Sequence, residues 1–448
     1  MPTIVQENDP QPAALPLSRR ERRWLTVTVA VAFALRLIYA CATTGLSITP
    51  PKDYREYVLS GQRLLRQGTI VSPLITTREP TEPSALIPPA YSFLVAGVYA
   101  LLGVETRPAT ALLRLINVAA STAVVVFAFL LARRLAGRKA AWGGAILATL
   151  HPTLIGYVTY LWDTTLFTLA VVVSAYVAHR LGDRPPTARR MLLFGLWLGA
   201  VAWINPALTI AYPFFVLWPI VRSGGWRWKR VARGVIVSVA GWALAIAPWT
   251  IRNYIQFDRI FYMRNGLGLE LWLGTCPEAD ADPARVFYER FPLLNEDAQA
   301  KVSRIEEQAF LDEARHKAFE AIRADPGRFV KLVALRTLDY WAGTMLTRSR
   351  HTRFGYPLAP SKRIVSISQG VSVLMLIVLL IVRRRRPVAG TGWLVMVLLV
   401  FSIVYCITHV QIRYRAPTEP ILMVLLAVLA FPATVERLRV APPSLDRS

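Results

Sequence analysis

The feature that most constrains this chain is a series of apolar segments of about twenty residues, separated by clusters of arginine. The first segment runs from Trp24 to Leu46 and follows Arg19, Arg20, Arg22 and Arg23. A segment of this length can cross the hydrocarbon core of a bilayer as one helix. With 54% hydrophobic residues and a mean hydropathy of +0.39, the chain is predicted to be an integral membrane protein.

The net charge of +24 could indicate a nucleic-acid partner, but the basic residues gather at the ends of apolar segments rather than in a domain of their own. Arginine and lysine at such positions mark the loops that stay in the cytoplasm, where they contact anionic headgroups. Membrane lipids are therefore expected partners, and nucleic acid is not. The cysteines Cys41, Cys276 and Cys406 are too scattered for a metal cluster or a disulfide framework.

The positive-inside rule predicts an all-α polytopic membrane protein of roughly ten transmembrane helices, with both termini in the cytoplasm. This arrangement leaves no arginine cluster on the outward side. The expected spans are 24–46, 111–132, 140–157, 160–178, 191–205, 207–221, a seventh that ends at Pro248-Trp249, 366–382, and a last pair that brackets His409 to Glu419.

Two outward sections, 45–110 and 250–364, are too long to be simple connectors. In the first, the spacing of apolar residues from Tyr54 to Gln67 predicts a helix at the membrane interface, where Pro89 to Gly103 is also expected. The second carries more than half of the acidic residues, and 296–323 is typical of a soluble helix. The expected divisions are a cytoplasmic tail (1–23), an N-terminal transmembrane module (24–249), an outward platform (250–364), C-terminal transmembrane helices (365–435) and a second tail (436–448).

Asp53 lies just beyond the first span, in Pro50-Pro51-Lys52-Asp53-Tyr54, and the topology places it on the outward side. An acid at this position of a protein with many spans is a candidate catalytic base. The alternative is a helix cap, because Asp is a favoured residue at the start of a helix such as the one expected from Tyr54.

The order of several motifs resembles that of the GT-C membrane glycosyltransferases, in particular the bacterial branch related to protein O-mannosyltransferases and lipid A aminoarabinose transferases. The resemblance extends over nearly the whole chain and depends on the order and placement of these motifs. They are Asp53-Tyr54 with Tyr57 and Gly61; Pro88-Pro89-Ala90-Tyr91 leading to Leu102-Gly103; Arg114 with Asn117, then 131–137; 248–254 with Gly274; and 413–417 with Pro420.

The resemblance implies transfer of a sugar from a polyprenyl-phosphate carrier to a lipid, polysaccharide or protein acceptor, at the outward face of a bacterial inner membrane. In such enzymes the acid of the first outward loop acts as general base, which here is Asp53. The chemistry agrees, because the acceptor must lose a proton to a carboxylate while cations stabilise the leaving phosphate. Relatives often carry a second acid beside the first, whereas Asp53 is followed by Tyr54.

Asp163 lies at the outer end of the fourth expected span, where an ionisable group is costly and commonly functional. It could orient the acceptor, bond an arginine, or hold a divalent metal ion together with Asp53. A cap at the start of the helix is the structural alternative. No other cofactor is expected.

Arg413 and Arg415, with His409 beside them, occupy a short outward loop, whereas the other short outward loops contain no arginine. Two arginines in this position require an anionic partner, and the expected partner is the phosphate of the donor. The alternative is a pair that binds lipid headgroups or Glu419.

Arg252 is a second candidate for the phosphate, with Asn253 and Tyr254 able to bond a sugar or a phosphate; a simple interfacial anchor is the alternative. Arg36 lies well inside the first span and is expected to pair with an acid or a phosphate, or to be purely structural. Arg114 is a further candidate that could instead reach the interface from the second span.

Two other functions remain open. A polymerase or ligase that moves a lipid-linked glycan would use the same chemistry, and a membrane transporter would not. Transport predicts inverted repeats and broken helices at the middle of the membrane, and neither is visible in the sequence.

Overall fold

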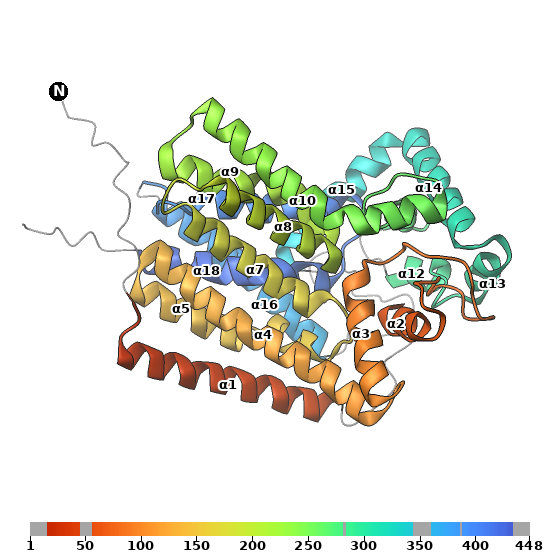
Figure 1. The fold of residues 1–448 in the computed structure, drawn as a ribbon, viewed down its shortest axis with the longest axis horizontal. Helices are drawn as coiled ribbons and strands as arrows, with labels where there is room; N and C mark the ends of the chain where they lie inside the picture. Colours follow the sequence, from red (N-terminus) through yellow and green to blue (C-terminus); the bar gives the residue numbers. More distant parts are fainter. Residues whose placement is uncertain (1–15, 45–55, 281–283, 344–359, 386–387, 433–448) are drawn as a thin grey trace, which may run out of the picture.

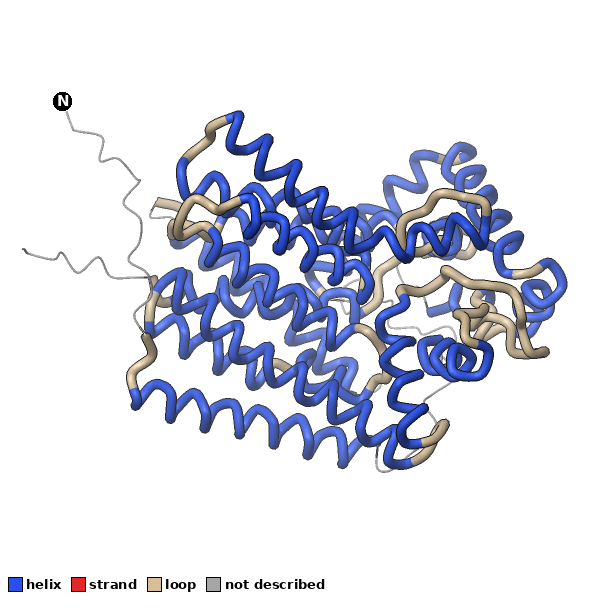
Figure 2. The backbone as a smooth tube through the Cα atoms, in the orientation of Figure 1, coloured by secondary structure: helices blue, strands red, loops and turns tan. Residues whose placement is uncertain are grey.

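The computed structural model describes residues 16–44, 56–280, 284–343, 360–385 and 388–432. Within these ranges the chain is helical apart from its loops and one isolated bridge between Val71 and Pro83 (Figures 1 and 2). This confirms the expected all-α polytopic fold. Asp53, the tail 436–448 and most of the tail 1–23 lie outside the described residues.

Ten helical segments lie side by side and correspond to the ten expected spans (Figure 1). Six segments are long and apolar enough to cross a membrane, and four are shorter. The six are α1 (Arg19–Thr44), α4 (Arg107–Ala136), α7 (Thr164–Leu181), η3 with α9 (Pro206–Ala211 and Tyr212–Gly224), α10 (Trp228–Phe257) and α16 (Pro360–Arg383). The shorter four are α5 (Arg138–Leu150), α8 (Ala188–Ile204), α17 (Gly392–Ile407) and α18 (Glu419–Ala430).

Two helix ends differ from expectation. The helix α10 continues through Pro248 to Phe257, so its 30 residues extend about 45 Å, more than the roughly 30 Å of a bilayer core. The soluble helix expected at 296–323 is broken into α13 (Glu296–Ile305) and α14 (Glu307–Ala324), because Glu306 adopts a positive φ of 67°.

Close packing of α8 on α10 depends on glycine. A Cβ atom on Gly195 would collide with the carbonyl group of Ser238, and one on Gly241 would collide with the carbonyl oxygen of Leu192. Small residues of this kind let two helix backbones approach closely where lipid surrounds them. This pair of helices forms one side of the bundle (Figure 1).

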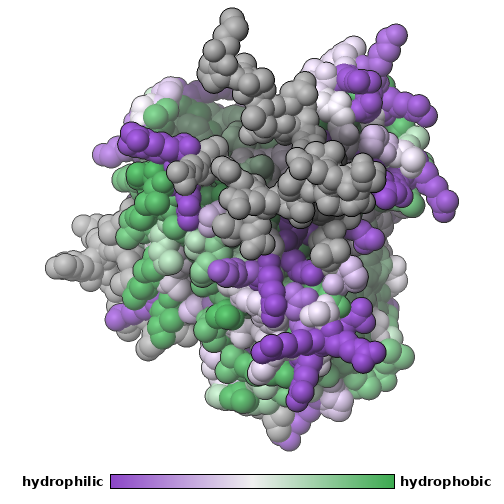
Figure 3. Space-filling model, turned by 90° about the vertical axis from the view of Figure 1, so that its left-hand side faces the viewer, coloured by the Kyte–Doolittle hydropathy of each residue, from purple (hydrophilic) through white to green (hydrophobic). Residues whose placement is uncertain are grey.

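The two ends of the bundle differ in composition. The basic end holds the start of α1 and the connections from α4 to α5, α7 to α8, α9 to α10 and α16 to α17, all of which carry arginine (Figures 1 and 3). The opposite end, called here the site end, carries the remaining elements. These are α2 (Glu56–Gln67), α3 (Pro89–Leu102), α6 (Pro152–Gly156), η2 (Tyr157–Thr159), α11 (Leu267–Thr275), α12 (Ala284–Arg290), α13, α14, α15 (Pro326–Ala342) and η4 (Ile412–Thr418).

Candidate functional site

A cavity of about 420 Å³ lies at the site end, where the bundle meets α2, α11 and α12. Its lining comes from the ends of bundle helices and from the segments 56–87 and 262–291. The lining combines apolar side chains with charged and polar ones. The polar lining consists of Glu56, Tyr57, Asp163, Thr164, Asn205, Thr209, Tyr262, Arg264, Glu270, Tyr405, Thr408, Arg413 and Tyr414, beside Trp162.

Asp163 is buried at the wall of this cavity, directly before α7. The Asn205 Nδ2 group donates a hydrogen bond of 2.8 Å to its carboxylate, and the Tyr57 hydroxyl also bonds to it. The amide of Asn205 is oriented by its oxygen, which accepts from the backbone of Ala207 at 3.0 Å. The Asp163 side chain makes no capping bond to α7, so the helix-cap alternative does not describe it.

Arg413 reaches the same cavity from η4. The centre of its guanidinium lies 3.7 Å from the centre of the Trp162 ring, and its Nη2 atom lies 3.5 Å from the Tyr414 hydroxyl. Stacking on an aromatic face holds a cation without neutralising it. Arg413 and Asp163, both of which the sequence analysis named as candidates, therefore line the same cavity, and their roles stay predictions.

Three charged residues of the cavity were not among the sequence-based candidates: Glu56, Arg264 and Glu270. Arg264 and Glu270 form an ion pair at 2.7 Å. Burial raises the pKa of Glu56 to about 7, although Arg413 opposes the shift. A carboxyl group with this pKa can both give and take a proton near neutral pH.

His409 lies behind the cavity wall rather than on it. Its ring is 2.8 Å from the Tyr414 hydroxyl and 3.4 Å from a carboxylate oxygen of Glu270. Burial lowers the pKa of His409 to about 4, so the imidazole is neutral at pH 7. Its contacts orient Tyr414, which is a positioning role.

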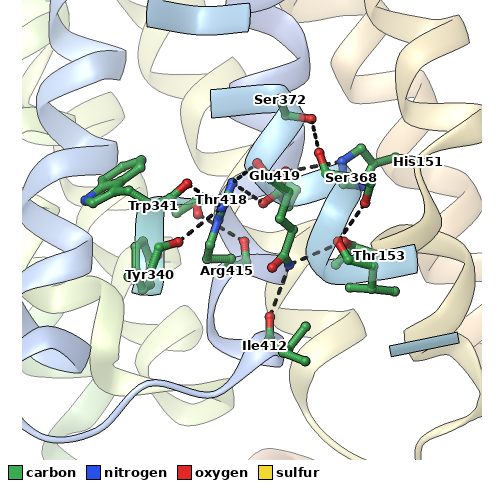
Figure 4. A network of polar contacts seen from close by, with 12 residues as sticks. His151, Thr153, Tyr340, Trp341, Ser368, Ser372, Ile412, Arg415, Thr418 and Glu419 are labelled. Carbon is green, nitrogen blue, oxygen red and sulfur yellow. Dashed lines mark hydrogen bonds and ion pairs between the residues drawn. The ribbon is translucent and has the colours of Figure 1, made fainter. Parts of the chain in front are cut away.

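Arg415 points away from the cavity into a buried polar network (Figure 4). It pairs with Glu419 at 2.8 Å and donates to the backbone carbonyl groups of Tyr340, Trp341 and Gln369 at 3.1 to 3.2 Å. The Arg415 side chain is only 4% exposed and that of Glu419 only 1%. The partner of Arg415 is thus Glu419, one of the alternatives that the sequence left open.

Arg252 also lies away from the cavity. It donates to the carbonyl oxygens of Ser84 and Ile70 at 2.9 and 3.1 Å, and so ties α10 to the loop 68–88 between α2 and α3. The neighbouring Asn253 is buried against the carbonyl group of Met263, and Tyr254 is half exposed. Neither of these two residues lines the cavity.

The same loop also contacts Glu307, the first residue of α14. The Ser84 hydroxyl donates to one Glu307 oxygen at 2.6 Å, and the Ser72 hydroxyl donates to the other. Glu307 is fully buried, and burial raises its pKa to about 7. The loop that leads from α2 to α3 is therefore held between Arg252 and Glu307.

Arg36 and Arg114 do not line the cavity. For Arg36 the sequence left open a pair with an acid or a phosphate and a purely structural role. It bonds to the Ser121 hydroxyl at 2.7 Å and to the carbonyl oxygens of Ala148 and Thr149 at 2.9 and 3.3 Å, which agrees with the structural alternative. Carbonyl groups near the end of α5 are free to accept because they have no partner within the helix. Arg114 is half buried on α4.

No group of three His, Cys, Asp or Glu side chains that could hold a metal ion occurs in the described part of the chain. The expected pairing of Asp163 with Asp53 around a divalent ion involves a residue outside that part, so the metal stays a prediction. The same holds for Asp53 as catalytic base.

Comparison with known proteins gives matches to solved structures only, since neither a family model nor a curated protein matches the chain. The oligosaccharyltransferase of Archaeoglobus fulgidus, in complex with Zn and sulfate, has a TM-score of 0.53 at 15% identity over 91% of this chain and 48% of that one. The oligosaccharyltransferase AglB of the same organism, with an inhibitory peptide and a dolichol-phosphate, gives 0.52 at 14% identity over 92% and 50%. ArnT of Cupriavidus metallidurans, bound to undecaprenyl phosphate, gives 0.39 at 13% identity over 91% and 77%.

The chain shares the fold of these oligosaccharyltransferases. The match extends over nearly the whole chain and agrees with the GT-C fold predicted from the sequence. The chain spans about half the length of those structures, and identities near 15% concern the fold alone.

We expect Arg415→Gln to lower thermal stability strongly and Arg413→Gln to leave it nearly unchanged. Removing one partner of a buried ion pair leaves the other charge uncompensated, which typically costs about 3 to 5 kcal/mol. Arg413 lies on the cavity wall, and Asp163 and Glu270, the buried carboxylates that it acts on there, keep their contacts with Asn205 and Arg264 when it is lost. Melting of the two purified variants in detergent checks this, and equal loss of stability in both would contradict the separate roles.

Glu307 should make the stability of the wild-type protein fall as pH rises. A carboxyl group whose pKa is raised in the folded state, here from 4.5 to about 7, stabilises the fold only while it is protonated. Relative to Glu307→Gln, the wild type should lose up to about 3 kcal/mol between pH 4.5 and pH 7 and little more above that. Melting temperatures at pH 5.5 and 8.5 measure the difference, with the exposed Glu320→Gln on the same helix as control. A constant difference across this range would overturn the assignment.

Proposed function

We propose that this chain is a membrane glycosyltransferase that moves a sugar from a polyprenyl-phosphate-linked donor to an acceptor at the outward face. The observation that carries the proposal is the cavity in which Arg413 and carboxyl groups face one space. Transfer of a sugar from a phosphate needs both kinds of group, a cation for the departing phosphate and a carboxylate for the proton of the acceptor.

The cavity suits a sugar and its phosphate. Its volume of about 420 Å³ is within the roughly 300 to 1,000 Å³ typical of small-molecule sites. Its lining includes apolar side chains such as Leu267, Phe287 and Phe291, against which the first isoprene units of a carrier can pack. Glycosyltransferases of this fold are compatible with such a donor, since AglB was solved with a dolichol-phosphate.

Arg413 is assigned to the donor phosphate. It is a delocalised cation on the cavity wall, held in place by Trp162 and Tyr414. Arg415 and Arg252 are assigned structural roles, because their donors are directed to Glu419 and to backbone carbonyl groups. Of the two arginines in the sequence motif, Arg413 is thus assigned to substrate binding and Arg415 to a structural role.

Asp53 is assigned as the general base that takes the proton of the acceptor. Asp163 positions the acceptor, because Asn205 and Tyr57 fix its carboxylate toward the space that the acceptor would occupy. Glu56 follows Asp53 by three residues and lines the cavity, so it supplies the second acid that relatives carry directly beside the first. Its raised pKa lets it pass a proton near pH 7.

In this proposal the protein lies in a bacterial inner membrane, with the site end on the outward side and the basic end on the cytoplasmic side.

A ligase that transfers a whole lipid-linked glycan remains the second candidate. The ligase is favoured by the fold that the chain shares with an oligosaccharyltransferase. Donors with one sugar and with several sugars distinguish the two functions.

Asp53→Asn should lower the rate of sugar transfer by about 100-fold or more while the protein stays folded, because it removes the base without changing the shape of the side chain. The measurement is transfer of radiolabelled sugar from polyprenyl-phosphate donors to a membrane acceptor fraction by protein reconstituted in liposomes. Asp312→Asn, an exposed carboxylate that pairs with Arg259, is the matched control. An active Asp53→Asn enzyme would falsify the base assignment, and uptake of sugar without transfer would indicate a transporter.

Arg413→Gln should weaken use of the donor far more than use of the acceptor. A charge-assisted hydrogen bond to a phosphate is worth about 1.5 to 3 kcal/mol, so kcat/KM for the donor should fall by roughly 10- to 150-fold. Arg259→Gln, at the exposed pair with Asp312, removes one positive charge away from the cavity and serves as control. If the acceptor KM changes instead of the donor kinetics, the phosphate binds elsewhere.

A further inference from the structure

A second cavity, of about 520 Å³, lies at the basic end of the bundle, opposite the proposed active site. It is formed where the starts of α8 and α10 meet the last turns of α9. Its lining includes Thr187, Met191, Ile220, Lys229, Arg230 and Arg233. No residue is shared with the cavity at the site end.

The positive charge of this cavity comes from the first two turns of α10. Lys229 and Arg233 are four residues apart and so lie on one face of the helix, with Arg230 beside them. The Nη1 atom of Arg230 bonds to the carbonyl oxygen of Gly224 at 3.1 Å, which fixes this side chain at the cavity. Three cations thus converge on one hollow.

Three other arginines at the basic end have carboxylates of the protein beside them. Arg133 and Arg138 lie 3.8 and 3.7 Å from Glu21, and Arg134 pairs with Asp183. Within the described ranges no carboxylate pairs with Lys229, Arg230 or Arg233, and none lines the cavity. Charges gathered in a hollow in this way attract an anion from outside the protein.

The surroundings of the cavity indicate what kind of anion. Trp226 and Trp228, just before Lys229 in the sequence, are 64% and 71% exposed, and tryptophan is favoured at a membrane interface. Farther along the same helices, Ile236 of α10 and Leu193 of α8 are 66% and 53% exposed. An anionic head at the cavity would therefore continue into apolar chains along these helices.

We propose that this cavity binds the phosphate headgroup of an anionic phospholipid from the leaflet at the basic end. Basic pockets between transmembrane helices recognise such headgroups through their charge. The bound lipid would bridge α8 and α10, whose close backbone contact forms one side of the bundle. The proposal is independent of sugar transfer, since the two cavities lie at opposite ends.

Native mass spectrometry of the full-length protein in detergent tests the proposal with added phosphatidylglycerol, phosphatidylcholine and soluble glycerol phosphate. Phosphatidylglycerol should bind more tightly than phosphatidylcholine. The double variant Lys229→Gln/Arg233→Gln should bind it about 25-fold more weakly, because each cation beside an anionic lipid contributes roughly a five-fold gain in affinity. Arg233→Lys, which keeps the charge, should retain most of the affinity.

The double variant Arg384→Gln/Arg385→Gln is the matched control, because it removes the same charge from exposed positions at the same end. It should bind phosphatidylglycerol within about two-fold of the wild type. Equal losses of affinity in both double variants would mean that only the overall charge of the protein matters, and would overturn the proposed site. Equal binding of phosphatidylcholine would also overturn it, as would full displacement of the lipid by an equimolar amount of glycerol phosphate, since the ligand would then be free phosphate.

Discussion

The buried ion pair between Arg415 and Glu419 is the contact on which the candidate site depends. Taking both charges out of water is costly, and the cost is offset only where further hydrogen bonds surround the pair. Three carbonyl groups from α15 and α16 provide these bonds, so η4 is fastened to two helices at once (Figure 4). That attachment fixes the direction in which Arg413 leaves the same turn. The chemistry assigned to one arginine therefore relies on the architecture supplied by the other.

The sequence identified the loop that holds both arginines but could not divide their roles. The signal was the presence of two arginines in a short loop predicted to be outward, where the topology predicts none. This signal is the same for both arginines. The division arises because η4 is a 3₁₀ turn with three residues per turn, so side chains two positions apart point in different directions. Only the packing of α15 and α16 decides which direction is interior. For Asp163, likewise, the fold brings in Asn205 and Tyr57 from distant segments.

The membrane helices could be predicted well because apolar length and flanking arginine are local properties. The break at Glu306 could not, since one residue with positive φ separates two segments of the same pattern. Glu270 did carry a usable signal, because it is an acid within the apolar run of α11, where a charge is costly unless it is paired or functional. Glu56 had a weaker one, namely its place in the helix that follows Asp53. Arg264, the partner of Glu270, carried no signal in the sequence, because its role follows only from the side chains that surround it in the fold.

The two ends of the molecule treat their cations differently, and this difference links the two proposed sites. At the site end, Arg264, Arg259 and Arg290 each pair with a carboxylate of the outward sections. Carboxylates of the chain balance these three positive charges. Arg413 on the cavity wall can then bind the phosphate of the proposed donor. At the basic end the acids of the described chain are fewer than the cations, and anionic lipids are the expected source of the remaining negative charge. The same charge balance from which the orientation in the membrane is predicted thus connects the proposed lipid site at one end with the proposed catalytic cavity at the other.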